Sequence, residues 1–264
     1  MEQVAAKARS RPGAENWISS REAFMLAFLG RLQQARSLSR RAVDQARQAG
    51  QRERAGLWEA GAALREAFFG NAAEARKRAA AALEGSRDRE AEYGAAFALA
   101  LGGDLSRSEA LADDLEKRFP EDTSVRFNYL PALRARIALN RGDTRKALDV
   151  LQPAIPYELG AHRSTIHALF GALYPVYERG EACLAARRGA EAAAEFERII
   201  ARRGIVLSDP VAVLARLQRG RALALPGDKT RAKAAYQDFL TLWQAADPDI
   251  PILRQAQREY SLVR

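Results

Sequence analysis

The sequence is poor in the residues from which metal and catalytic sites are usually built. Of its 264 residues, one is cysteine and two are histidine. The single cysteine, Cys183, excludes an intramolecular disulfide. His162 and His167 are five residues apart, a spacing that does not place two ligands on one face of a helix. No carboxylate or cysteine joins them at ligand spacing, so we expect no metal, no cofactor and no enzymatic activity of the chain itself.

Long apolar runs are also missing. No stretch approaches the roughly 18 apolar residues that a membrane helix needs, and residues 1–7 lack the apolar segment of a signal peptide. We therefore expect no membrane segment in this chain and a cytoplasmic location. An extracytoplasmic location is the alternative if the parent chain has an upstream membrane helix. Alternating β-branched and aromatic residues are scarce, which argues against a sheet.

Helix-forming residues are abundant instead, chiefly Ala, Leu, Arg and Glu. A length of 264 residues exceeds the usual single core, so the chain holds either two domains or a repeat array. The net charge of +9 is uneven: residues 1–50 carry nine basic and four acidic groups, and residues 201–264 carry eleven and six. Such basic ends fit an acidic partner or nucleic acid; a solubilising surface of arginine stems is the alternative.

A repeated glycine punctuates the chain and predicts a helix–turn–helix unit. In five copies this glycine is followed four to five residues later by a small residue; the glycines are Gly30, Gly70, Gly103, Gly142 and Gly227. A glycine in the left-handed conformation ends a first helix, and a following Asp or Asn caps the second. A weaker sixth copy places Arg187 at this position. We expect positive φ at Gly142 and Gly227, and buried Ala147 and Ala232 at helix crossings.

Other positions of the repeat are counted from this glycine, and we call the residues at one such position in all copies a column. Seven residues earlier, all six copies have a small residue: Ala23, Ala63, Ala96, Ala135, Gly180 and Gly220. Nine residues later come Ser39, Ala79, Ala112, Leu151, Phe196 and Tyr236, and three further on Ala42, Ala82, Leu115, Ala154, Ile199 and Phe239. Because these columns recur at helical spacing, we expect them to form the core between repeats.

The pattern predicts an all-α solenoid of about six tetratricopeptide-like helix pairs in a single superhelical domain, residues 1–264. The expected pairs are 17–50, 55–85, 90–119, 124–155, 165–203 and 209–245. A last helix over 251–262, apolar at Leu253, Ala256 and Tyr260, is expected to cap the final repeat.

Several strings carry a resemblance to a known family. They are residues 63–67, 69–76, 112–120, 156–160, 173–180, 234–240 and 246–253. Together they resemble the tetratricopeptide (TPR) C-terminal region of bacterial eukaryote-like serine/threonine protein kinases and related signalling regulators, over nearly the whole chain. The resemblance implies an interaction or sensing module. The phosphate loop, strand lysine, His-Arg-Asp loop and Asp-Phe-Gly motif of a kinase are absent, so kinase activity does not follow.

The first helix of each pair is expected to line a concave groove, and large side chains there are candidates for partner contact. They are Tyr93, Phe97, Tyr129, Arg136, Asn140, Tyr174, Tyr177, Glu181 and Arg221, preceded by Trp17 and Phe24 in the first pair. Tyrosine and arginine are common at interaction hot spots, although each aromatic taken singly fits a core position equally well. Arg136 and Asn140 lack the neighbouring Lys and Asn of a carboxylate clamp.

These features favour a protein- or peptide-binding scaffold, a sensor or docking module of a bacterial signalling kinase or regulator. Nucleic-acid binding through the basic ends is the alternative. It is less favoured because aromatic residues do not alternate with the basic ones as stacking platforms require.

Overall fold

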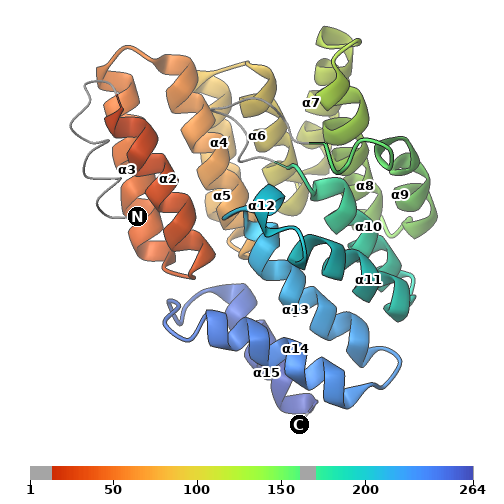
Figure 1. The fold of residues 1–264 in the computed structure, drawn as a ribbon. Coiled ribbons are helices and arrows are strands. Elements are labelled where there is room, and N and C mark those ends of the chain that lie inside the picture. Colours follow the sequence, from red (N-terminus) through yellow and green to blue (C-terminus); the bar gives the residue numbers. More distant parts are fainter. Residues whose placement is uncertain (1–13, 161–170, 264) are drawn as a thin grey trace.

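The computed structural model describes residues 14–160 and 171–263, which form helices and no strand (Figure 1). Successive helices pack as antiparallel pairs. The pairs are α2 (Glu15–Phe28) with α3 (Leu32–Gln48), α4 (Arg52–Phe68) with α5 (Ala72–Gly85), α6 (Arg89–Leu101) with α7 (Leu105–Arg118), α8 (Leu130–Asn140) with α9 (Thr144–Val150), α10 (Tyr174–Ala185) with α11 (Gly189–Ile200), and α13 (Pro210–Ala224) with α14 (Lys229–Leu242).

Four shorter or terminal elements complete the chain. A π-helical turn, η1 (Val125–Tyr129), leads into α8, and a 3-10 turn, η2 (Gln152–Ala154), follows α9. A short helix, α12 (Arg203–Val206), lies in what the sequence indicated as a connection, and α15 (Pro251–Leu262) is the C-terminal helix. Residues 165–170, the expected start of the fifth pair, lie outside the described residues, as do His162 and His167.

The turns inside the pairs have the predicted geometry. Gly142 and Gly227 have φ of 78° and 84°, as expected, and Arg187 reaches 59° at the same position of the fifth pair. Asp143 and Asp228 then cap the second helices, each accepting a backbone N–H three residues on, at 2.9 Å and 3.0 Å. The helix–turn–helix prediction is therefore confirmed.

The predicted core columns are buried throughout the stack. Every residue of the two columns in the second helices is at most 2% exposed, and Ala147 and Ala232 are fully buried. In the last two pairs an aromatic residue occupies the first of these columns, and glycine replaces alanine where the first helix crosses. A methyl group at Gly180 would lie 2.7 Å from the Phe196 ring, and one at Gly220 3.1 Å from Tyr236. The small residue thus makes room for the large one.

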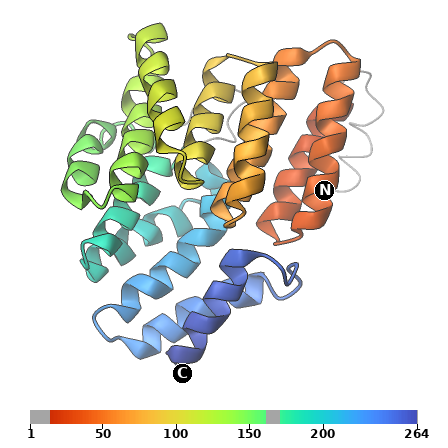
Figure 2. The ribbon, with the colours of Figure 1, turned by 180° about the vertical axis from the view of Figure 1, so that it is seen from behind.

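The stack curls until its two ends touch (Figures 1 and 2). The indole Nε1 of Trp243 donates to Phe28 O at 2.9 Å, and the backbone N–H of Asp247 donates to Gly30 O at 3.0 Å. At the second turn, Ile252 N donates to Phe69 O at 3.3 Å. The turn of the first pair therefore packs against the segment that joins α14 to α15, and the turn of the second pair packs against the first residues of α15.

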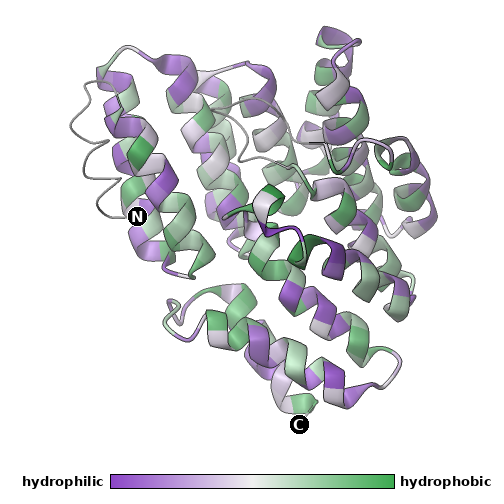
Figure 3. Cartoon of the chain, in the orientation of Figure 1, coloured by the Kyte–Doolittle hydropathy of each residue, from purple (hydrophilic) through white to green (hydrophobic). Residues whose placement is uncertain are grey.

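Apolar residues gather where helices face one another, and polar residues cover the outer helices (Figure 3). The helix α6 is buried on every side from Glu90 to Ala100. In the C-terminal helix, Leu253 and Ala256 are buried and Tyr260 is half-buried against the core, which fits a capping role.

Candidate functional site

The aromatic side chains expected in an open groove are buried instead. Tyr93, Phe97, Tyr129, Tyr174 and Tyr177 are each at most 3% exposed. The prediction that they line a partly exposed concave face is therefore wrong. Four of them lie on the first helices of their pairs and Tyr129 lies in η1 just before α8, but these elements face other parts of the same chain.

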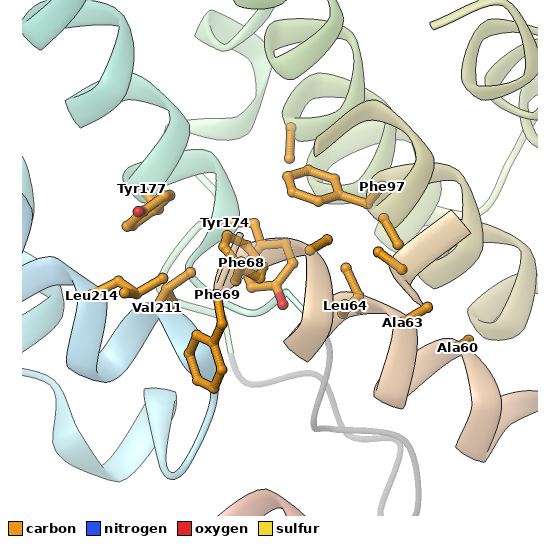
Figure 4. Packing of buried hydrophobic residues seen from close by; sticks show 14 of the residues in the cluster. Ala60, Ala63, Leu64, Phe68, Phe69, Phe97, Tyr174, Tyr177, Val211 and Leu214 are labelled. Carbon is orange, nitrogen blue, oxygen red and sulfur yellow. The ribbon is translucent and has the colours of Figure 1, made fainter. Parts of the chain in front are cut away.

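The interior of the curl is filled by side chains from both halves of the chain (Figure 4). Phe68 from α4 meets Tyr174 and Tyr177 from α10, with ring centroids 5.3 Å and 5.8 Å apart. Tyr93 stacks on Tyr129 at 4.0 Å. Aromatic rings bury a large apolar area and pack edge to face, so this cluster acts as core.

The polar candidates mostly hold helices together. Arg136 pairs with Glu178 at 2.8 Å and with Glu181 at 3.7 Å, joining α8 to α10. Burial raises the pKa of the Glu178 carboxyl, and the guanidinium of Arg136 opposes that rise. Asn140 donates to Ala100 O at 2.6 Å, although its surface is exposed.

Arg221 and the two first-pair candidates are also engaged within the chain. Arg221 pairs with Glu259 of α15 at 2.8 Å and so ties the capping helix to α13. Phe24 is buried, and Trp17 is half-buried beside the guanidinium of Arg21, 4.8 Å from the ring centre. None of the expected contact residues therefore forms an open aromatic surface.

A wide depression lies elsewhere, among α11, α12, α13 and α14, with Phe28 of α2 at its border. This α11–α14 groove has a volume of about 640 Å³, within the range of ligand sites. Its apolar wall includes Ile200, Leu207 and Leu242, and its charged lining is Arg203, Arg216, Arg219 and Asp238. Sequence reasoning missed it because its arginines come from two helices, Arg203 from α12 and Arg216 and Arg219 from α13, which come together only in the fold.

Three further features of the described residues concern metal binding, thiol chemistry and membrane insertion. Within residues 14–160 and 171–263, no three His, Cys, Asp or Glu side chains are grouped to hold a metal ion. Cys183 is buried, and burial raises the pKa of its thiol, which disfavours the nucleophilic thiolate. In the same ranges no helix is long and apolar enough to span a bilayer.

Comparison with known proteins identifies the fold. The sequence matches no model of a protein family and no curated protein. Among solved structures it is similar to yeast Tom70, a TPR-repeat helical protein, with a TM-score of 0.50 and 13% identity over 99% of this chain. The fold is a TPR-type α-solenoid. The match covers 57% of the Tom70 chain, so the solenoid spans a little over half of that structure.

Proposed function

We propose that this solenoid is a protein-binding scaffold without chemistry of its own, located in the cytoplasm. The observation that carries the proposal is the α11–α14 groove, which is open, partly apolar and cationic on the surface of a TPR-type fold. Partly apolar depressions with a few charged side chains are typical of recognition sites. Because the interior is filled, the outer surface is the part that contacts a partner.

The finer role that we propose is that of a sensor or docking module of a bacterial signalling kinase or regulator. The resemblance of residues 63–76 and 112–120 to the TPR region of bacterial kinases supports it. Nucleic-acid binding is the competing function, supported by the net charge of +9.

Affinity capture with the immobilised chain separates the two functions. The lysate of the encoding organism is applied at low and high salt, because binding to phosphates weakens steeply as salt rises. We expect proteins that remain bound at high salt, and a kinase among them would support the docking role. Recovery of nucleic acid alone, released by salt, would favour the alternative, and recovery of neither would remove the scaffold proposal.

A further inference from the structure

The positive charges of the α11–α14 groove are only partly neutralised by carboxylates. Its lining contains three arginines and one aspartate, Asp238. Arg219 pairs with Asp238 at 3.4 Å and also with Glu197. Within the described residues, Arg203 and Arg216 have no carboxylate partner; Arg216 donates to the backbone of its own helix, at Ala212 O. The groove therefore has two guanidinium groups available for an anion.

The setting of Arg216 makes an anionic ligand favourable. Its side chain is half-buried, and burial lowers its pKa, as do the charges of Arg203 and Arg219, while the carboxylates of Asp238 and Glu197 oppose that change. This guanidinium is therefore partly dehydrated, and within the described residues no carboxylate lies at ion-pair distance from it. A carboxylate between Arg203 and Arg216 would supply the missing partner through charge-assisted hydrogen bonds.

Leu207 adds a second, independent observation. It has φ 49° and ψ −126°, a conformation found at the first central position of a type II′ turn and suited to glycine. Arg187 is the other described non-glycine residue with positive φ, and the helix–turn–helix unit accounts for it. Leu207 is 51% exposed at the groove, so core packing does not explain why a large apolar side chain stands there.

In a second depression of this chain, the arginines are paired with carboxylates. It lies beside α7 and α8, has a volume of about 600 Å³ and includes Phe119 and Phe127. Its arginines are paired: Arg134 with Glu116 at 2.6 Å, and Arg126 with Glu121 at 3.5 Å. The α11–α14 groove differs from this second depression in having arginines without a carboxylate partner.

We infer that the α11–α14 groove binds an acidic, amphipathic peptide segment of a partner protein. Its carboxylates pair with Arg203 and Arg216, and its apolar side chains contact Leu207 and Leu242. The unpaired arginines favour carboxylates and the apolar wall favours apolar side chains. An amphipathic helix that lies in a groove presents both kinds of side chain together. This inference rests on the proposed scaffold function and specifies its binding site and partner chemistry.

Fluorescence anisotropy with a synthetic peptide tests it. The probe is a labelled helical peptide of glutamate and leucine, and its counterpart has glutamine for every glutamate. We expect the acidic peptide to bind the wild-type chain. The Arg203→Gln/Arg216→Gln variant should bind it at least about tenfold more weakly, because both partners of its carboxylates are lost; a tenfold change corresponds to about 1.4 kcal/mol. Arg145→Gln is the matched control, because Arg145 is exposed on α9, and it should bind like wild type.

Leu207→Gly separates a binding role from a structural one. Glycine accepts the backbone conformation at this position, so the melting temperature should stay the same or rise while peptide affinity falls. A variant that binds as well as wild type would overturn the role of Leu207.

The remaining outcomes are equally decisive. Equal affinity for both peptides, unchanged affinity of the double arginine variant, or no binding of the acidic peptide would overturn the inference. Preference for an oligonucleotide, or self-association of the chain that requires Arg203 and Arg216, would assign the groove to another occupant. A partner captured from lysate equally by wild type and the double variant would leave the scaffold function standing and remove only this site.

Discussion

Replacing Gly30 with alanine tests whether the two ends of the solenoid touch in solution. Gly30 has φ of 75°, and an added Cβ would lie 2.3 Å from the Cβ of Ala246, near the other end of the chain. Gly227 is the matched control: its φ is 84°, and an added Cβ would have no neighbour within 4 Å. The two substitutions share the backbone penalty and differ in the contact between the ends.

The expected costs follow from these geometries. Left-handed backbone costs a non-glycine residue about 1–2 kcal/mol, partly offset by lower entropy of the unfolded chain. Gly227→Ala should therefore lower the free energy of unfolding by about 1 kcal/mol. Gly30→Ala adds overpacking, which costs about 1–3 kcal/mol more. Adding Ala246→Gly to Gly30→Ala should recover part of that extra cost.

Urea denaturation followed by circular dichroism measures the difference, and amide exchange at Asp247 reports the contact locally. Exchange of this amide should quicken in Gly30→Ala, because its N–H donates to Gly30 O, and stay unchanged in Gly227→Ala. If both variants lose the same stability within about 0.5 kcal/mol and Asp247 exchanges as in wild type, the closed curl is wrong.

Three further predictions concern the interior. Trp243→Ala should lower the free energy of unfolding by about 3–5 kcal/mol in chemical denaturation, because it deletes a fully buried ring and its hydrogen bond to Phe28 O. Arg136→Ala should cost about 3–5 kcal/mol in the same assay, since Glu178 would be left buried and unpaired; an exposed-pair value below about 1 kcal/mol would contradict this. Burial raises the pKa of Asp209 to about 7 from 3.8, so its stabilising contribution is present below about pH 4 and lost as pH rises through about 7. The stability of wild type relative to Asp209→Asn should therefore fall across this range, by up to about 1.4 kcal/mol per pH unit, and parallel pH profiles would refute the assignment.

The local structure could be predicted from the sequence because each repeat contains the residues that end its first helix and begin its second. A glycine at the turn, an aspartate after it and small residues at the crossings are local requirements, and they hold at Gly142, Asp143 and Ala147. The curl depends instead on small rotations between successive pairs. No single residue sets these rotations, so the contact of Trp243 with the first turn was not predictable from spacing.

One sequence feature did contain information about the closed interior. Residues 91–100 are apolar on nearly every side of their helix, a pattern typical of a helix buried all round rather than one that borders a groove. Tyr93 and Phe97 lie within this segment and are fully buried. Position in the repeat alone led to the opposite expectation, because it identifies which helices face inward but not how much space remains between them.

The difference between position in the repeat and arrangement in space also explains why the α11–α14 groove could not be predicted from the sequence. Its guanidinium groups come from α12 and α13, and only the crossing of these helices brings Arg203 near Arg216. The positive φ of Leu207 is likewise invisible in a sequence where leucine is common. Under the proposed function, a filled interior places recognition on the outer surface, where helices of neighbouring repeats meet and where unpaired charge, rather than position in the repeat, is the expected sign of a site. In a solenoid this tightly curled, we therefore expect the partner surface to include outward-facing arginines that have no carboxylate partner within the described chain, as Arg203 and Arg216 do in the α11–α14 groove.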